Sequence, residues 1–185
     1  MRGVIPNHLI DEFAFLDSLP VSNPPEPWRL AHRRAVGGLT EVGFSDTSDL
    51  LLIASHSGRG VVDCSQGILV ARDDDNDFQF DLGNLLVEGI GPLEGKLIRV
   101  AGLSGGGLVT HTTDGWGLER HPLSFPEDEV FLSAPGQTML WAPPGAKRSL
   151  TKFADFVTEL RAFGFSPTGR HFVFATSSDL YVYSR

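Results

Sequence analysis

The sequence predicts an all-β protein made of antiparallel meanders, arranged as a β-propeller-like fold or a twisted sheet or sandwich, with one or two short helices. Three observations lead to this class. Gly and Pro are frequent, at 21 and 12 of 185 residues, so turns must be frequent. Apolar runs such as Leu50–Ala54 are of strand length. A stretch of 25 residues also occurs twice, and each copy has the pattern of strands separated by turns.

The repeat relates residues 39–63 to residues 160–184 without a gap, at an offset of 121 residues. Eight positions are identical, namely Leu39/Leu160, Gly43/Gly164, Phe44/Phe165, Ser45/Ser166, Thr47/Thr168, Ala54/Ala175, Ser57/Ser178 and Val61/Val182. These are glycine, apolar and turn residues, which specify a scaffold. Function is therefore expected where the copies differ, at His56, at Arg59 and in the acidic extension after Ala71.

Residues 7–19, NHLIDEFAFLDSL, predict a short helix with Asn7 as its N-cap. One face of this helix carries Leu9, Phe13 and Leu16. Residues 20–27 contain four prolines, which exclude regular structure and predict an extended connector. We expect a single domain, with the helix and connector over residues 1–27 and β meanders over residues 28–185.

Residues 28–36 suit either an edge strand or a helical turn. A fourth strand of the first copy is predicted at residues 68–71, followed by a solvated acidic loop, RDDDND, at residues 72–77. Further strands are predicted at residues 78–82, 96–101, 108–112 and 116–118, and a hairpin at residues 130–134 and 138–142. A second helix is predicted at residues 149–160, where Phe153, Phe156, Val157 and Leu160 can share one face. Its end overlaps the second repeat copy, so the alternative is that its last turn begins a strand.

The phrase GFSPTGRHFVFATSSDLYVYSR at residues 164–185 resembles a blade of a WD40-like β-propeller. The matching residues are Phe165, Ser166, Pro167, Gly169, Ala175 and Tyr183, while Thr168 stands where Asp is usual and the WD dipeptide is absent. The earlier copy keeps Phe44 and Ser45 but has Asp46 and Ser48 where this phrase has Pro and Gly. The resemblance implies that residues 28–36 supply the missing outer strand. A chain of 185 residues allows at most four such blades.

The composition points to a globular protein, with 41% hydrophobic residues, no apolar run long enough to span a membrane, and a formal charge of −8. An acidic chain lacks the basic surface that nucleic-acid binding requires. The charge serves either solubility alone or the docking of a basic protein. A single cysteine, Cys64, excludes an internal disulfide framework. The first residues contain no apolar segment of signal-peptide length, so a cytoplasmic protein is expected.

The segment from Gly102 to Gly106 matches the G-x-S-x-G pattern of a hydrolase, with Ser104 as nucleophile. That pattern requires a strand before the serine and a helix after it, but the β-branched LVTHTT that follows does not predict a helix. His56 lies at a strand end and offers acid–base chemistry, although the second copy has Ser177 there. Cys64 lies beside Asp63 without a neighbouring cation, so an inert thiol is expected.

The sequence does not predict a metal site. The six histidines show no close pair with metal-ligand spacing; they are His8, His32, His56, His111, His121 and His171. Asp73, Asp75 and Asp77 have the alternate spacing of a calcium loop. Phe78 and Asn84 stand where that loop needs Gly and Glu, so a solvated loop is favoured.

We therefore expect no cofactor and no catalytic residue. The leading hypothesis is a non-enzymatic protein-binding module, and its concrete version is a bacterial immunity protein that neutralises a basic toxin. Its expected partner-binding residues are Asp73, Asp74, Asp75, Asp77, Glu127, Asp128 and Glu129. The alternatives are a hydrolase that uses Ser104 or His56, and a structural or assembly protein that associates through an exposed edge strand.

Overall fold

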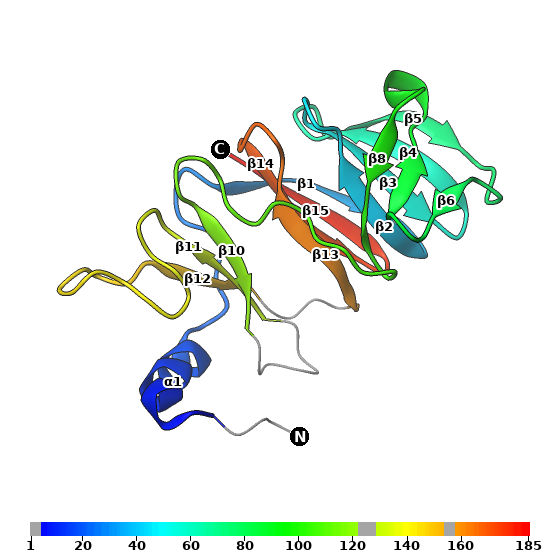
Figure 1. Cartoon of the computed structure of the whole chain (residues 1–185). Coiled ribbons are helices and arrows are strands. Elements are labelled where there is room, and N and C mark those ends of the chain that lie inside the picture. The colour runs from blue at the N-terminus through cyan, green and yellow to red at the C-terminus, as the bar shows by residue number, and fades with distance from the viewer. Residues whose placement is uncertain (1–4, 122–128, 154–157) are drawn as a thin grey trace. The chain divides into compact units, whose positions relative to one another are not determined.

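The computed structural model describes residues 5–121, 129–153 and 158–185 (Figure 1). In these residues the strands form four antiparallel sheets, which confirms the mainly β class. The contacts divide the chain into two compact units. The larger unit comprises Glu26–Thr110 and Thr158–Arg185, and the smaller unit comprises Met1–Pro25 and His111–Val157. No helix in the described ranges has the length and apolarity needed to cross a membrane.

Both copies of the repeat fold into the same three strands. The strands of the first copy are β2 (Leu39–Phe44), β3 (Leu50–Ser55) and β4 (Gly58–Asp63). The strands of the second copy are β13 (Leu160–Phe165), β14 (His171–Thr176) and β15 (Asp179–Ser184). Every strand bound keeps the offset of 121 residues. The register shift between Leu39 and Glu41 recurs between Leu160 and Ala162. The repeated glycine and turn residues thus specify the same backbone twice.

A fourth strand completes each sheet. β5 (Ile68–Asp73) follows β4 along the chain, whereas β1 (Arg29–Ala35) comes from the N-terminal region and pairs with β15. In Figure 1 the blue β1 lies beside the red β15. This confirms that residues 28–36 supply the outer strand of the second copy. We call β2–β3–β4–β5 the first meander and β13–β14–β15–β1 the second meander.

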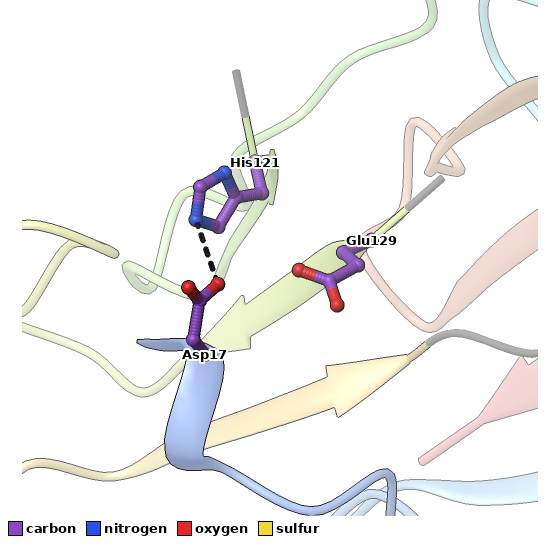
Figure 2. Close-up of side chains that lie close together, drawn as sticks. All are labelled: Asp17, His121 and Glu129. Carbon is purple, nitrogen blue, oxygen red and sulfur yellow. Dashed lines mark ion pairs between the residues drawn. The ribbon is translucent and has the colours of Figure 1, made fainter. Parts of the chain in front are cut away.

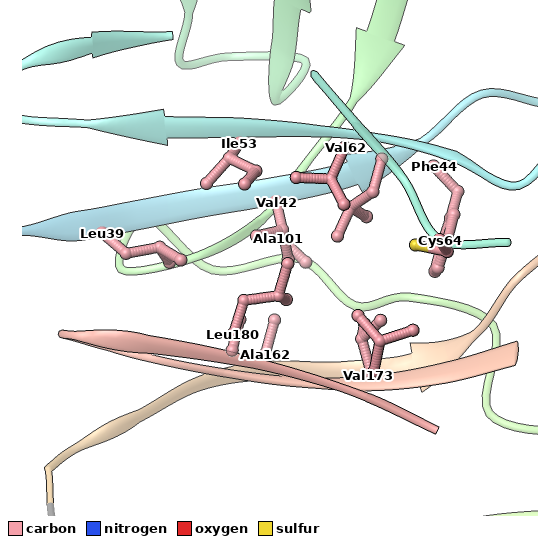
Figure 3. Close-up of a cluster of buried hydrophobic side chains, with 13 residues drawn as sticks. Leu39, Val42, Phe44, Ile53, Val62, Cys64, Ala101, Ala162, Val173 and Leu180 are labelled. Carbon is pink, nitrogen blue, oxygen red and sulfur yellow. The ribbon is translucent and has the colours of Figure 1, made fainter. Parts of the chain in front are cut away.

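The two meanders pack against each other through an apolar core (Figure 3). The first meander contributes the face that carries Ile53. Phe174, which holds the same repeat position in the second meander, is not part of this core. The second meander contributes the opposite face, which includes Val173. The buried members are Leu39, Val42, Phe44, Leu51, Ile53, Val62, Cys64, Ala101, Ala162, Val173, Ala175, Leu180 and Val182. The front of one sheet therefore packs on the back of the next, and burial of this apolar area stabilises the pair.

A third, smaller sheet covers the other face of the first meander. It consists of β6 (Phe80–Asp81), β7 (Leu86–Glu88) and β8 (Leu97–Arg99), with the 3₁₀ helix η2 (Gly91–Leu93) between β7 and β8. Leu52 and Val61 pack there against Val87, Leu93 and Ile98. β3 and β4 of the first meander are thus buried on both faces, as the continuous apolar run at Leu50–Ala54 predicts.

The segment after β8 passes the inner edges of both meanders. β9 (Ala101–Gly102) pairs with β2, and Val109 forms a single bridge with Phe165 of β13. The repeated glycines leave room for this passage. A Cβ atom at Gly43 would lie 2.3 Å from the carbonyl oxygen of Arg99, and one at Gly164 would lie 2.4 Å from the Cβ atom of Leu108. These glycines are therefore required by the close approach of another chain segment.

The smaller unit combines the N-terminal helix with a three-stranded sheet. α1 (Ile10–Ser18) follows the 3₁₀ turn η1 (Asn7–Leu9), and the sheet consists of β10 (Gly117–Arg120), β11 (Val130–Ser133) and β12 (Leu150–Phe153). One cluster of buried side chains joins the helix to the sheet, and it comprises Phe13, Leu16, Phe131 and Met139. The predicted helix and its apolar face are confirmed, but Pro6 is the N-cap of η1 and Asn7 lies inside it.

Three predicted elements are wrong. The helix expected at residues 149–160 is replaced at Leu150–Phe153 by β12, which pairs with β11; residues 154–157 lie outside the described part. Apolar spacing in this short segment fits both periodicities, and the pairing with β11 decides between them. The strand expected at residues 138–142 is a tight turn closed between Thr138 and Trp141. The strand expected at residues 108–112 makes only isolated bridges.

Candidate functional sites

The acidic loop after β5 is held in place by its own main chain. The amide of Asp75 donates a 3.0 Å hydrogen bond to Oδ1 of Asp73, and the amide of Asp77 donates a 2.9 Å hydrogen bond to Oδ1 of Asp75. These successive Asx turns explain the alternate Asp spacing without a calcium ion. The side chain of Asp74 is 83% exposed and pairs at 2.6 Å with Nε of Arg72.

Arg59 anchors this loop to the body of the larger unit. Its Nη2 atom donates a 2.6 Å hydrogen bond to Oδ2 of Asp73, and its Nη1 atom donates one of 2.8 Å to the carbonyl oxygen of Glu88. The guanidinium also lies 5.1 Å from the ring centroid of Phe78. The hydrogen bond from Arg59, followed by that from the amide of Asp75, lowers the pKa of Asp73. The loop therefore presents carboxylates from a fixed position.

The strand that leads into the acidic loop has an apolar exposed surface. β5 is the last strand in the order of its sheet, and Ile68, Leu69 and Val70 are 46%, 39% and 39% exposed. β1, which holds the matching place in the second meander, instead carries arginines. Charged side chains on edge strands discourage pairing with other chains. On β5 the charged side chains are Arg72 and Asp73, both at its end next to the acidic loop.

The second expected acidic patch lies in the smaller unit. Glu127 and Asp128 are outside the described residues, so their expected role stays a prediction. Glu129 precedes β11, and its Oε1 atom lies 2.6 Å from the Nζ atom of Lys152, whose side chain is buried. The carboxylate of Glu129 therefore neutralises a buried ammonium group, which requires such a partner.

Glu129 also belongs to a cluster that sequence reasoning missed, with Asp17 and His121 (Figure 2). One nitrogen or oxygen atom from each of the three lies within 4.8 Å of the others. Nε2 of His121 is 3.9 Å from Oδ1 of Asp17, and the buried imidazole lies 5.0 Å from the ring centroid of Phe13. The three residues come from the end of α1, the end of β10 and the start of β11, so no sequence spacing could reveal the cluster.

Carboxylate and imidazole groups are metal ligands, and their separation here suits a common ion. The ammonium of Lys152 lies 2.6 Å from Glu129, however, at hydrogen-bonding distance from one of the three groups. A divalent cation beside this ammonium would be repelled, because the interaction of two like charges is strong where water is excluded. We interpret the cluster as a charge network that joins α1 to the sheet of the smaller unit.

A second unforeseen constellation lies where the two meanders meet. Nε2 of His171 is 3.3 Å from Oγ of Ser65 and 3.7 Å from Oδ2 of Asp49. A catalytic serine–histidine–aspartate triad uses both ring nitrogens, one toward the serine and one toward the carboxylate. Here both partners face Nε2, and Nδ1 of His171 has no hydrogen-bond partner in the described part of the chain. Burial lowers the pKa of His171, against the effect of Asp49 and Asp63. The geometry is that of a contact between sheets.

The residues named for a hydrolase are not brought together with a catalytic set. Ser104 lies in a tight turn closed by bonds between Gly102 and Gly105, and its amide donates a 2.8 Å hydrogen bond to Oε1 of Glu41. This is not the strand–turn–helix context of a nucleophile elbow. His56 is exposed in the β3–β4 turn. Cys64 is buried, and burial, with Asp49 and Asp63, raises the pKa of its thiol, which disfavours the reactive thiolate.

The larger unit contains a pocket of about 290 Å³ at the margin between the two meanders. Its polar lining includes the side chains of Arg34, Arg72, Ser55 and Ser57, and its apolar lining includes Val36, Ile53 and Leu69. Arg34 comes from β1 of the second meander, and Arg72 from β5 of the first. No sequence motif indicated this pocket, because its lining is assembled from both meanders.

No protein-family model, curated protein or solved structure matches the chain.

Proposed function

We propose that this protein is a non-enzymatic protein-binding module, whose binding surface is β5 together with the Asp73–Asp77 loop. The observation that carries the proposal is the run of exposed apolar side chains at Ile68, Leu69 and Val70 on an edge strand. Apolar edge strands pair readily with a strand of another chain. The adjacent loop supplies negative charge, so the partner that fits this surface presents a basic, extended segment.

The acidic loop gives this surface both selectivity and speed of association. Arg59 and the two Asx turns hold the loop before any partner arrives, so little conformational entropy is lost on binding. Charge complementarity accelerates encounter with a basic partner and excludes acidic ones. The formal charge of −8 acts in the same direction at long range.

We further infer that the two meanders are blade-like units of the WD40-like propeller type. Their shared offset, their shared register shifts and their front-to-back packing support this interpretation. Blade-like sheets serve as scaffolds whose edges and loops bind partners, which agrees with a binding role. An immunity protein that neutralises a basic toxin is the concrete form of this proposal.

The two alternative functions would use different parts of the molecule. An assembly protein would use the same β5 edge to pair with a second copy, which the exposed apolar run also supports. A hydrolase would use Ser104 or His56, and turnover that is lost in Ser104→Ala or His56→Ala is the result that favours it.

The immunity form is tested by co-expression with the product of the neighbouring gene. The expected result is that this product arrests growth alone and that the present chain restores growth by forming a stable complex. Restoration should be lost with Ile68→Lys and Val70→Lys, while Leu103→Lys, at an exposed apolar position away from β5, is the control. A neighbouring product that is harmless alone, or growth that is not restored, would refute the immunity form.

The binding surface itself is tested with whatever partner co-purifies with the chain. Charge reversal at Asp74 and Asp75 should slow association, more at low salt than at high salt. Unchanged association rates would remove the acidic loop from the interface. Self-association that depends on β5 and needs no second protein would instead establish the assembly role.

A further inference from the structure

The pocket in the larger unit lies at a repeat position where the two meanders carry different side chains. Gly60 of β4 and Tyr181 of β15 hold the same place in the repeat, 121 residues apart. Each lies opposite an arginine on the outer strand, since Gly60 pairs with Arg72 and Tyr181 pairs with Arg33. The ring that fills this place in the second meander is therefore missing in the first, and Gly60 lines the pocket instead.

The second meander shows which groups suit this place. The guanidinium of Arg33 lies 5.1 Å from the ring centroid of Tyr181, and its Nε atom pairs at 3.2 Å with Oδ1 of Asp179. An aromatic ring and a carboxylate thus satisfy this arginine together. The first meander has Gly58 where the second has Asp179, so Arg72 lacks the ring, and its Nε atom pairs instead with the exposed carboxylate of Asp74.

The remaining lining suits a ligand with the same two groups. Arg34 and Arg72 supply positive charge, and the hydroxyl group of Ser57 supplies a hydrogen bond, whereas the hydroxyl of Ser55 already donates to the carbonyl oxygen of Gly58. Ile53 and Leu69 supply an apolar wall. Arg72 donates from Nε to Asp74 and from Nη2 to the carbonyl oxygen of Ser57, which leaves Nη1 for a ligand. The carboxylate of Asp74 is 83% exposed, and such surface pairs contribute little. The volume of about 290 Å³ is adequate for one substituted ring, since a cavity of about 150 Å³ holds benzene.

We propose that this pocket binds an aromatic acid, a planar ring that carries a carboxylate group, in the place that Tyr181 and Asp179 fill in the second meander. The ring lies against Ile53 and Leu69 over Gly60, and the carboxylate accepts hydrogen bonds from Arg34 and Arg72. The ligand is a free small molecule. This function goes beyond the proposed protein-binding surface, with which the pocket shares Leu69 and Arg72 of β5.

The test is a titration of the ¹⁵N-labelled full chain with phenylacetate, followed by two-dimensional NMR. Phenylacetate should bind in the millimolar range and shift the amide signals of Gly37, Ser57 and Gly60. 2-Phenylethanol, which has the ring without the charge, and acetate, which has the charge without the ring, should both bind more weakly. N-acetyl-glycyl-phenylalanine presents the same two groups at the end of a peptide and distinguishes that source from a free acid.

Three variants locate the site. Arg34→Gln and Arg72→Gln should each weaken phenylacetate binding about tenfold, as expected for a lost charge-assisted hydrogen bond. Arg33→Gln, the matched change in the second meander, should leave binding unchanged. Gly60→Tyr should abolish binding by filling the pocket, after the tip of Leu69, 3.0 Å from the new Cβ atom, moves aside. The arginine variants keep the test valid if Gly60→Tyr does not fold.

Several results would overturn the proposal. Absence of shifts with phenylacetate, equal binding of 2-phenylethanol, or equal weakening by Arg33→Gln would each show that the pocket does not recognise an aromatic acid. Binding of the peptide without binding of phenylacetate would refute the assignment to a free small molecule.

Discussion

The hydroxyl of Thr168 donates a 2.6 Å hydrogen bond to Oδ1 of Asp49, which joins the first turn of the second meander to the first turn of the first. The other carboxylate oxygen of Asp49 lies 3.7 Å from Nε2 of His171. Thr168 stands where the propeller phrase usually has Asp. A second carboxylate at this place would lie close to Asp49 and repel it, so the threonine suits this contact between sheets.

We predict that stability depends on pH through His171. Burial lowers its pKa in the folded state, so the unfolded chain binds more protons near and below pH 6.5, the ordinary pKa of histidine. The free energy of unfolding should be highest above about pH 6.5 and should decrease as the pH falls from there toward the lowered pKa. Urea unfolding between these limits measures the effect. His171→Gln should reduce the slope and His56→Gln should not; an equal slope in all three proteins would contradict the assignment.

We predict that the repeated glycines resist substitution. Gly43→Ala and Gly164→Ala should each lower the free energy of unfolding by about 1–3 kcal/mol, because the added methyl group meets atoms of another chain segment. Gly37→Ala is the matched control, since a Cβ atom there has nothing within 4 Å. Thermal unfolding of the three variants gives the comparison. Equal stability of all three would show that the close approach at Arg99 and Leu108 is relaxed at little cost.

We predict that Glu129 matters mainly as the partner of Lys152. Glu129→Ala leaves a buried ammonium without this carboxylate and should destabilise the protein by about 3 kcal/mol. Lys152→Met removes the charge instead and should cost much less. Urea unfolding monitored by signals of the smaller unit separates the two. If Lys152→Met is as destabilising as Glu129→Ala, packing around the lysine stem is the dominant effect.

We predict that Arg59 keeps the acidic loop ordered. Arg59→Ala removes the hydrogen bonds to Asp73 and to the carbonyl of Glu88, so the amides of Asp75 and Asp77 should exchange with solvent more rapidly. Hydrogen–deuterium exchange reports this directly. Arg99→Ala, which loses only a 3.4 Å contact with the carbonyl of Asn84, should leave the exchange of these amides unchanged.

The repeat made much of the larger unit predictable from the sequence. Glycine and turn residues at matched places, such as Gly43 and Gly164, determine where the strands begin and end, and the missing outer strand identified residues 28–36. The strand at Leu150–Phe153 was not predictable, because a short apolar segment acquires its conformation from its neighbour β11.

The sites were less accessible than the fold. The alternating aspartates correctly indicated a solvated loop, but only the structure shows that Arg59 anchors it. The pocket depends on the pairing of Gly60 with Arg72, and this strand register cannot be read from the alignment of the two copies. The cluster of Asp17, His121 and Glu129 joins three separate segments, and long-range packing alone brings them together.

The pairing of β1 with β15 has a consequence for the order in which the two meanders fold during synthesis. β2 to β5 are contiguous in the sequence, so the first meander can form as soon as residue 73 has left the ribosome. β1 is synthesised earlier still, but its partner is the last of the described strands to emerge. Until β15 has been synthesised, β1 lacks its strand partner. Its arginines keep it hydrated in this interval and discourage pairing with other strands. Completion of the second meander is therefore a late event that follows synthesis of all the strands between β1 and β15.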